Sequence, residues 1–284
     1  MDKIEHVIEG LNQILWADVP DILKGLIIAL VVAALFKKQI KTHSWIFYLF
    51  PALMFFLCVA YGIMDLVKPA LLEKITEDTA VGSIFHILYG DFSATAVGIG
   101  FIIIVMFVGV LPKNKFVVSL FSIRKELSII GGAFLVGHAV LRFSTAFNSL
   151  KNPADELFFV IYGILGFVLL IIFAIPWITS FDCIRKKMSP QFWKKHQTYT
   201  AVPAFILMLT FGLLLNLAWT LYQSPNLLQS LWEVKAIGDY QIDNLGIGHQ
   251  FGNMQLSIRV YLFLLVSYIC LRYRRNKARQ EKKA

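Results

Sequence analysis

Seven long apolar stretches, separated by short polar loops, dominate this sequence of 284 residues. A helix needs about 20 apolar residues to cross the hydrocarbon core of a membrane, and the stretches are close to that length. Because lipid offers no hydrogen-bond partners, each spanning segment must satisfy its own backbone groups, which favours helix. We therefore predict an all-α integral membrane protein with about seven transmembrane helices, at residues 20–36, 45–64, 90–111, 127–147, 157–181, 198–222 and 256–272.

The charges of the loops predict the orientation of the chain. Lys and Arg gather in every second loop and in the C-terminal tail, whereas the alternate loops are poorer in both and carry Asp and Glu. Basic loops favour the cytoplasmic side of a membrane. We therefore expect the N-terminus outside and the C-terminus inside, in the cell (cytoplasmic) membrane. The basic segments lie within residues 37–41, 113–125, 185–195 and 272–283.

The composition agrees with this class of protein. Hydrophobic residues make up 57% of the chain and charged residues 16%, which is unusual for a soluble domain. Topology and anionic lipid head groups account for the net charge of +9, so we expect the lipid bilayer as a partner and no nucleic acid. The cysteines have no metal-type spacing, and we interpret Cys58, Cys183 and Cys270 as small packing residues.

The segments outside the spans are short. Residues 3–16 place apolar side chains at helical spacing, which predicts an amphipathic helix on the outer surface, and a similar segment is expected at 70–88. The longest polar loop, about 223–255, leaves no room for a nucleotide-binding domain. We expect four regions: the surface helix (1–19), two transmembrane helices with the outer segment (20–89), a core (90–222), and the outer loop, last transmembrane helix and basic tail (223–284).

Ionisable side chains inside a span are costly and therefore mark candidate functional sites. His138 lies well inside the fourth stretch, and Arg142 follows one turn later. Arg124 precedes His138 by 14 residues, so the two share one helix face about 21 Å apart along the axis. A histidine in this position could bind a metal or haem, carry protons, or pack against a neighbouring helix. Four small residues nearby allow close approach of a flat cofactor or of another helix. They are Gly131, Gly132, Ala133 and Gly137.

Several short motifs occur in a particular order along 90–222. The third stretch ends in Val110-Leu111-Pro112, Arg124-Lys125 opens the next, and His138 follows; later come Trp177-Ile178-Thr179-Ser180 and Trp193-Lys194-Lys195-His196-Gln197-Thr198-Tyr199. In order, spacing and sidedness these motifs resemble the ferric reductase-like transmembrane domain. The nearest likeness is the haem-binding membrane subunit of the bacterial periplasmic methionine sulfoxide reductase system (the MsrQ/YedZ group).

This resemblance implies a ferric reductase-like four-helix core that passes electrons across the membrane through haem b. His138 would be the ligand of an outer haem and His196 of an inner one, while Arg124 and Arg142 would handle propionate or quinone charge. Electrons would come from quinol or reduced flavin. They would leave to a separate extracytoplasmic reductase or flavoprotein, so the chain would be the membrane subunit of an oxidoreductase.

The sequence departs from the family at one ligand position. The family has a second His about 13 residues beyond the first on the sixth helix, where Leu209 stands here. Three arrangements could replace it: a thioether from Met208 after some rotation of the helix, His86 from the outer segment, or five-coordinate iron. The alternative is that this chain has kept the fold without haem.

Two other functions stay open from the sequence. A haem-free membrane scaffold or assembly subunit is favoured by the missing ligand at Leu209. A small-solute transporter would use His138 and Arg142 along a substrate path, although no inverted internal repeat is visible. Haem content distinguishes electron transfer from both alternatives.

Overall fold

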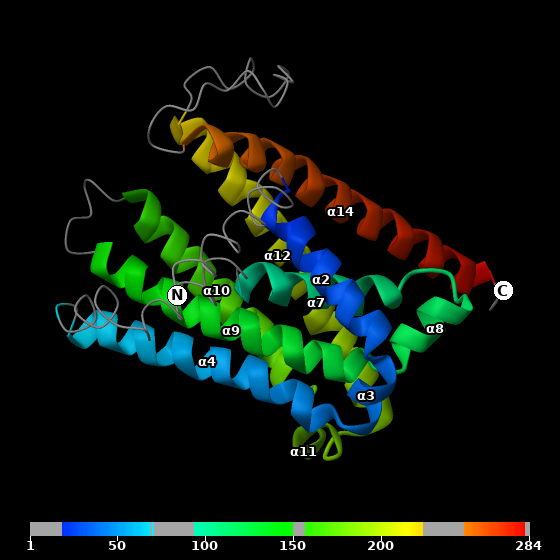
Figure 1. Cartoon of the computed structure of the whole chain (residues 1–284). Helices are drawn as coiled ribbons and strands as arrows, with labels where there is room; N and C mark the ends of the chain where they lie inside the picture. The colour runs from blue at the N-terminus through cyan, green and yellow to red at the C-terminus, as the bar shows by residue number, and fades with distance from the viewer. Residues whose placement is uncertain (1–18, 69, 71–93, 150–156, 224–246, 282–284) are drawn as a thin grey trace.

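Ten helices and no strand make up the part of the chain that the computed structural model describes, residues 19–68, 70, 94–149, 157–223 and 247–281 (Figure 1). The prediction of an all-α protein is confirmed for these residues. The surface helix expected at 1–19 and the outer segment expected at 70–88 fall almost entirely outside them, as does His86.

One helix lies over each of the seven apolar stretches. They are α2 (Asp21–Leu35), α4 (Ser44–Val67), α7 (Ala94–Val108), α9 (Arg124–Ser149), α10 (Leu157–Ile178), α12 (Pro190–Gln223) and α14 (Ile247–Glu281).

Four segments within these helices are long and apolar enough to cross a membrane. They are Ser44–Val67, Arg124–Phe143, Pro190–Ala218 and Leu256–Glu281. The outward faces of the bundle are apolar as well, as in α4, where Leu49, Leu53 and Phe56 are each more than half exposed. A soluble protein rarely exposes apolar surface on this scale, whereas lipid covers it favourably. The protein is therefore a multi-pass integral membrane protein.

Two helices extend beyond the apolar stretches that predicted them. We expected the sixth span to begin at 198, but α12 begins at Pro190, because proline suits the first helical position and Ser189 Oγ accepts a hydrogen bond from Phe192 N at 3.2 Å. The last stretch ends at 272, yet α14 continues to Glu281. Lys and Arg are good helix formers, so loss of apolarity marks the membrane boundary rather than the end of the helix.

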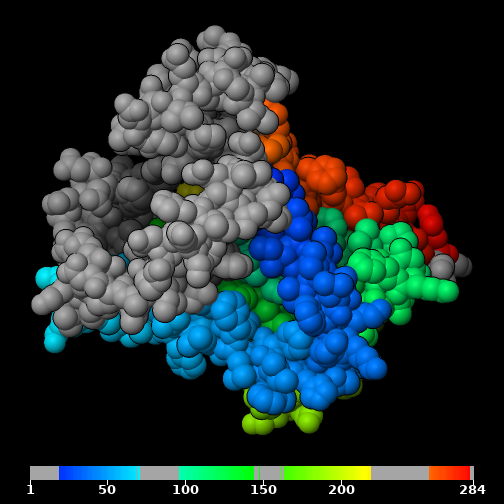
Figure 2. Space-filling model, viewed as in Figure 1, coloured from blue at the N-terminus to red at the C-terminus, as the bar shows by residue number. Residues whose placement is uncertain are grey.

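Three short helices lie in the basic loops: α3 (Lys37–Thr42), α8 (Lys115–Phe121) and α11 (Asp182–Arg185). Asn114 caps α8, since its side chain accepts a hydrogen bond from Val117 N at 2.8 Å. Figure 1 places all three at the same end of the bundle as the C-terminus of α14, and we call this the basic end. The space-filling view shows α8 and the end of α14 side by side there (Figure 2).

The helices pack in a simple order around α7, in which every residue from 96 to 106 is buried. α9 contacts both α7 and α10, and α10 contacts α12. The remaining long helices pack on the outside of this group: α2 against α7, α4 against α9, and α14 against α12. The helices from the third to the sixth stretch therefore lie together, with the first two and the last around them.

The small residues near His138 serve helix packing. A Cβ on Gly131 would come within 2.9 Å of Phe101 Cβ on α7, and one on Gly137 within 3.0 Å of Phe55 Cα on α4. A Cβ on Gly132 would overlap the indole of Trp177 on α10. Of the two explanations that the sequence left open at these positions, close approach of other helices is the one that the structure shows, as is common in membrane bundles.

Candidate functional site

Three of the predicted site residues, His138, Arg142 and Met208, line one pocket between α9, α10 and α12. This histidine pocket has a volume of about 160 Å³. Its other walls are mostly apolar and include side chains from α7 and α14. They are formed by residues such as Ile99, Phe167, Phe173, Phe211 and Tyr261.

Two adjacent positions on α12 lie in different surroundings. Met208 lines the histidine pocket, whereas Leu209 is 0% exposed, belongs to the apolar core and does not line the pocket. Successive residues point about 100° apart around a helix, so only one of the two can face His138. The thioether of Met208 shares the pocket with the imidazole.

The side chains of the histidine pocket are of the kinds that bind haem, but the pocket is small for a cofactor. Imidazole and thioether together ligate haem iron in some cytochromes, and a guanidinium such as that of Arg142 suits a propionate. The volume, however, is below the roughly 300–1,000 Å³ of typical cofactor sites. Gly212 offers no extra room, because a Cβ there would overlap the ring of Tyr261. The pocket is therefore smaller than a porphyrin requires, and haem would bind here only if α9, α10 and α12 moved apart.

His196, the predicted ligand of an inner haem, lies outside the cavities described here. It is in the second turn of α12, where its Nε2 lies 3.3 Å from Thr179 Oγ1 and its ring stacks on Phe192 at an interplanar angle of 10°. The Thr179 hydroxyl donates to Ile175 O at 3.0 Å. The imidazole therefore donates when Nε2 carries the proton, which links α12 to the end of α10.

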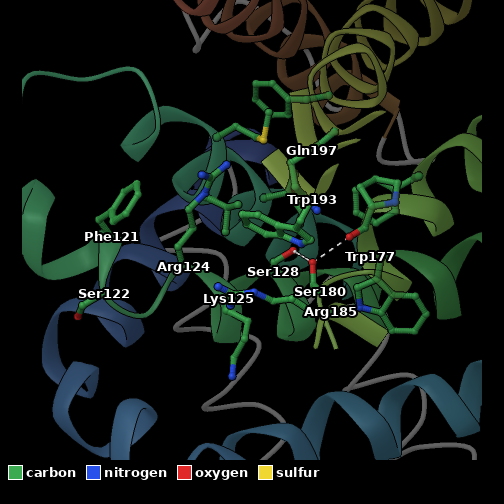
Figure 3. Close-up of a pocket in the computed structure, with 17 residues that line it drawn as sticks. Phe121, Ser122, Arg124, Lys125, Ser128, Trp177, Ser180, Arg185, Trp193 and Gln197 are labelled. Atoms are coloured by element: carbon green, nitrogen blue, oxygen red, sulfur yellow. Dashed lines mark hydrogen bonds between the residues drawn. The ribbon is translucent and has the colours of Figure 1, made fainter. Parts of the chain in front are cut away.

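Arg124 lies in a larger cavity at the basic end, which we call the core cavity (Figure 3). Its volume is about 430 Å³, within the range of ligand sites. All four helices of the predicted core contribute to it. The polar and aromatic side chains that line it are Ser122, Arg124, Lys125, Ser128, Trp177, Ser180, Arg185, Trp193 and Gln197. Figure 3 shows Arg124, Trp193 and Gln197 close together, with Ser128 hydrogen-bonded to Ser180.

The cations of the core cavity differ in how their charge is balanced. Lys125 Nζ lies 2.9 Å from Asp182 Oδ2 and 3.3 Å from Glu126 Oε1. The hydrogen bond from Lys125 holds the pKa of the Asp182 carboxyl below its usual value. The two arginines contact aromatic rings instead. Arg185 Cζ lies 4.7 Å from the centre of the Trp193 ring and Arg124 Cζ 5.9 Å from that of Phe121.

A third cavity, the arginine cavity, adjoins the core cavity and has a volume of about 350 Å³. Arg124, Trp193 and Gln197 line both. The arginines of the C-terminal tail predicted only the topology of the chain, yet Arg272, Arg275 and Arg279 line this cavity. Their spacing of three and four residues, which places them on one helix face, could have revealed them.

Comparison with protein-family models, with curated protein sequences and with solved structures finds no match. Within the described residues, no group of three or more His, Cys, Asp or Glu side chains is placed to hold a metal ion.

Proposed function

We propose that the protein is the membrane subunit of an electron-transfer system, with seven transmembrane helices, four of which form a ferric reductase-like core. The observation that carries the proposal is that His138 of α9 and Met208 of α12 line one pocket with Arg142. An imidazole and a thioether can together ligate haem iron, and an ionisable side chain such as that of His138 is costly inside a membrane span unless it serves a function. Haem b, when bound, would supply a one-electron carrier in the membrane.

The cofactor and the electron donor would bind at different positions along α9. His138 and Met208 would hold the outer cofactor, and Arg142, which lines the same pocket, would bind a propionate. At the basic end, Arg124 and Lys125 face the core cavity, where quinol or reduced flavin would deliver electrons. Positive-inside topology puts this end in the cytoplasm, in the cytoplasmic membrane. The acceptor is a separate extracytoplasmic reductase or flavoprotein.

Optical difference spectroscopy tests the proposal. Protein purified in detergent from cells supplied with a haem precursor should give a reduced-minus-oxidised spectrum with a Soret band and an α-band. His138→Ala should abolish both, and the volume-conserving Met208→Leu should shift them by removing the sulfur. His43→Ala is the matched control, because His43 is exposed in a basic loop. A featureless wild-type spectrum, or equal spectra in all variants, would reject haem ligation by this pair.

A haem-free scaffold or assembly subunit is the second candidate, and the small volume of the histidine pocket favours it. In that case His138 and Met208 would contribute to helix packing only. Wild-type protein, His138→Ala and Met208→Leu would then differ in thermal stability but in no optical property. A partner protein that co-purifies with all of them from the native membrane would support this function.

A further inference from the structure

A row of arginines on α14 faces two other helices at the basic end. Arg272, Arg275 and Arg279 follow one another at intervals of three and four residues, which places them on one face of the helix. That face lines the arginine cavity together with Arg124 from α9 and Lys194 from α12. Five cationic side chains from three helices therefore border one space.

Nothing acidic balances this charge among the described residues that line the cavity. The cations differ in exposure: Arg124, Arg272 and Arg275 are half-buried, whereas Arg279 and Lys194 are exposed. Arg272 lies near the side chain of Tyr268, a neutral and almost fully buried group that does not balance its charge. Like charges at close range repel strongly where water is limited. An anion in the space between them would offset this repulsion.

A buried hydrogen-bond donor lies in the wall that the core cavity and the arginine cavity share. The Nε1 atom of Trp193 is buried and has no hydrogen-bond partner within the described part of the chain, and its indole lines both the core cavity and the arginine cavity. Buried N–H groups are normally satisfied, because leaving one without an acceptor is costly. An indole N–H can only donate, so the missing partner is an acceptor such as an anionic oxygen.

The rest of the cavity wall is apolar. Met106, Val110 and Val202 extend it along α7 and α12 toward the interior of the membrane protein. Guanidinium groups bind phosphate oxygens through paired N–H donors, and a phosphate presents several acceptors at once. The shape and the charge together suit a phosphate group, either on a lipid that also uses the apolar wall or free in solution.

We infer that the arginine cavity binds a phosphate-bearing anion through Arg124, Arg275 and the indole N–H of Trp193. This anion site shares Arg124 with the core cavity of the proposed function, but it uses neither His138 nor Met208, so loss of haem binding would leave it untouched. It assigns the arginine row a ligand in addition to its role in topology.

Binding is measured by isothermal titration calorimetry on the delipidated full chain in a non-ionic detergent. The probes are dihexanoyl phosphatidylglycerol, dihexanoyl phosphatidylcholine and inorganic pyrophosphate. Phosphatidylcholine has the same chains and the same phosphodiester but a compensating cation. Tight binding of phosphatidylglycerol alone identifies a lipid as the source of the phosphate, whereas equal or tighter binding of pyrophosphate identifies a soluble anion.

Two variants test the residues. Arg275→Gln should weaken binding of the preferred probe about tenfold or more, because a hydrogen bond to a charged group is lost. Trp193→Phe keeps the aromatic wall, removes only the N–H, and should weaken binding several-fold. Arg274→Gln is the matched control. Arg274 is the sequence neighbour of Arg275 and carries the same charge, but it is exposed and does not line the cavity.

The outcomes separate a built site from general electrostatic attraction. Arg275→Lys keeps the charge and tests whether the cavity survives substitution. It should bind the probe more tightly than Arg275→Gln does, and it should elute as a single species in size-exclusion chromatography. Equal weakening by Arg274→Gln and Arg275→Gln would overturn the inference. So would equal affinity for phosphatidylglycerol and phosphatidylcholine without pyrophosphate binding, or binding that Trp193→Phe and Arg275→Gln leave unchanged.

Discussion

Gly132 on α9 lies directly against the indole of Trp177 on α10, so closely that a Cβ at position 132 would overlap the ring. The indole cannot turn away freely, because Trp177 Nε1 donates a hydrogen bond to Ile129 O at 3.1 Å. This contact sets the distance between two helices that line both the core cavity and the histidine pocket.

We expect Gly132→Ala to destabilise the protein by about 1–3 kcal/mol, the usual cost of overpacking a tight interface. The measurement is the Tm in detergent. Gly166→Ala on α10 is the control, because its Cβ would meet Phe211 Cζ at 3.9 Å, an ordinary contact. An equal fall in Tm for both variants would show that the Gly132–Trp177 contact has no special role.

Cys183 provides a test of orientation. It is exposed on α11 at the basic end, whereas Cys58 is buried in α4. With Cys270 replaced by Ser, we expect a membrane-impermeant maleimide to label Cys183 in inverted vesicles and not in intact cells, because the basic end should face the cytoplasm. Labelling of Cys183 from the outside of intact cells would show that the basic end faces outward, opposite to the predicted orientation. Cys183→Ser measures the background.

His196 should behave as a structural residue, because its imidazole contacts Thr179 and Phe192. We expect His196→Ala and Thr179→Ala each to lower stability, and the double variant to lose less than the sum, with a coupling of about 1 kcal/mol. In protein that carries haem, His196→Ala should leave the optical spectrum unchanged while His138→Ala abolishes it. Loss of the α-band in His196→Ala would instead support the inner-haem ligand implied by the family resemblance.

The Lys125–Asp182 pair predicts a dependence of stability on pH. The pKa of Asp182 in the folded protein is lowered from 3.8, chiefly by the hydrogen bond from Lys125. A lowered carboxyl pKa stabilises the folded state above the unfolded pKa, and this contribution is lost as pH falls through the folded pKa. Because Asp182 is half exposed, we expect less than about 1 kcal/mol.

The measurement compares the Tm of wild type and Asp182→Asn between pH 7 and pH 3. The difference should be largest at neutral pH, shrink below pH 3.8, and decrease in high salt. A difference that does not change with pH would mean that the effect of the substitution comes from packing and not from charge.

Much of the fold could be predicted because apolarity is a local property. Each helix in lipid satisfies its own backbone, so the seven apolar stretches predicted the positions of the seven long helices without reference to any contact. The ends were less accurate: α12 begins at Pro190, before its apolar part, because a proline and a serine cap decide that boundary.

The candidate site was predicted only in part, for a geometric reason. His138, Arg142 and Met208 were all candidates from the sequence, and the structure brings them into one pocket. His196 was a candidate as well, but it lies outside this pocket, where its ring contacts Thr179. The sequence placed Trp193 in a motif but did not predict its role. That its N–H is buried without a partner among the described residues depends on how the helices pack together.

The sequence by itself determined that this is a helical membrane protein, where its helices lie and which of its ends is basic, because hydropathy and charge act on each segment separately. Tertiary structure alone decided that Met208 and not Leu209 lines the pocket of His138, and that Arg272, Arg275 and Arg279 line one cavity with Arg124. Those choices depend on how far each helix is rotated about its axis, and the packing of large and small side chains between helices sets that rotation.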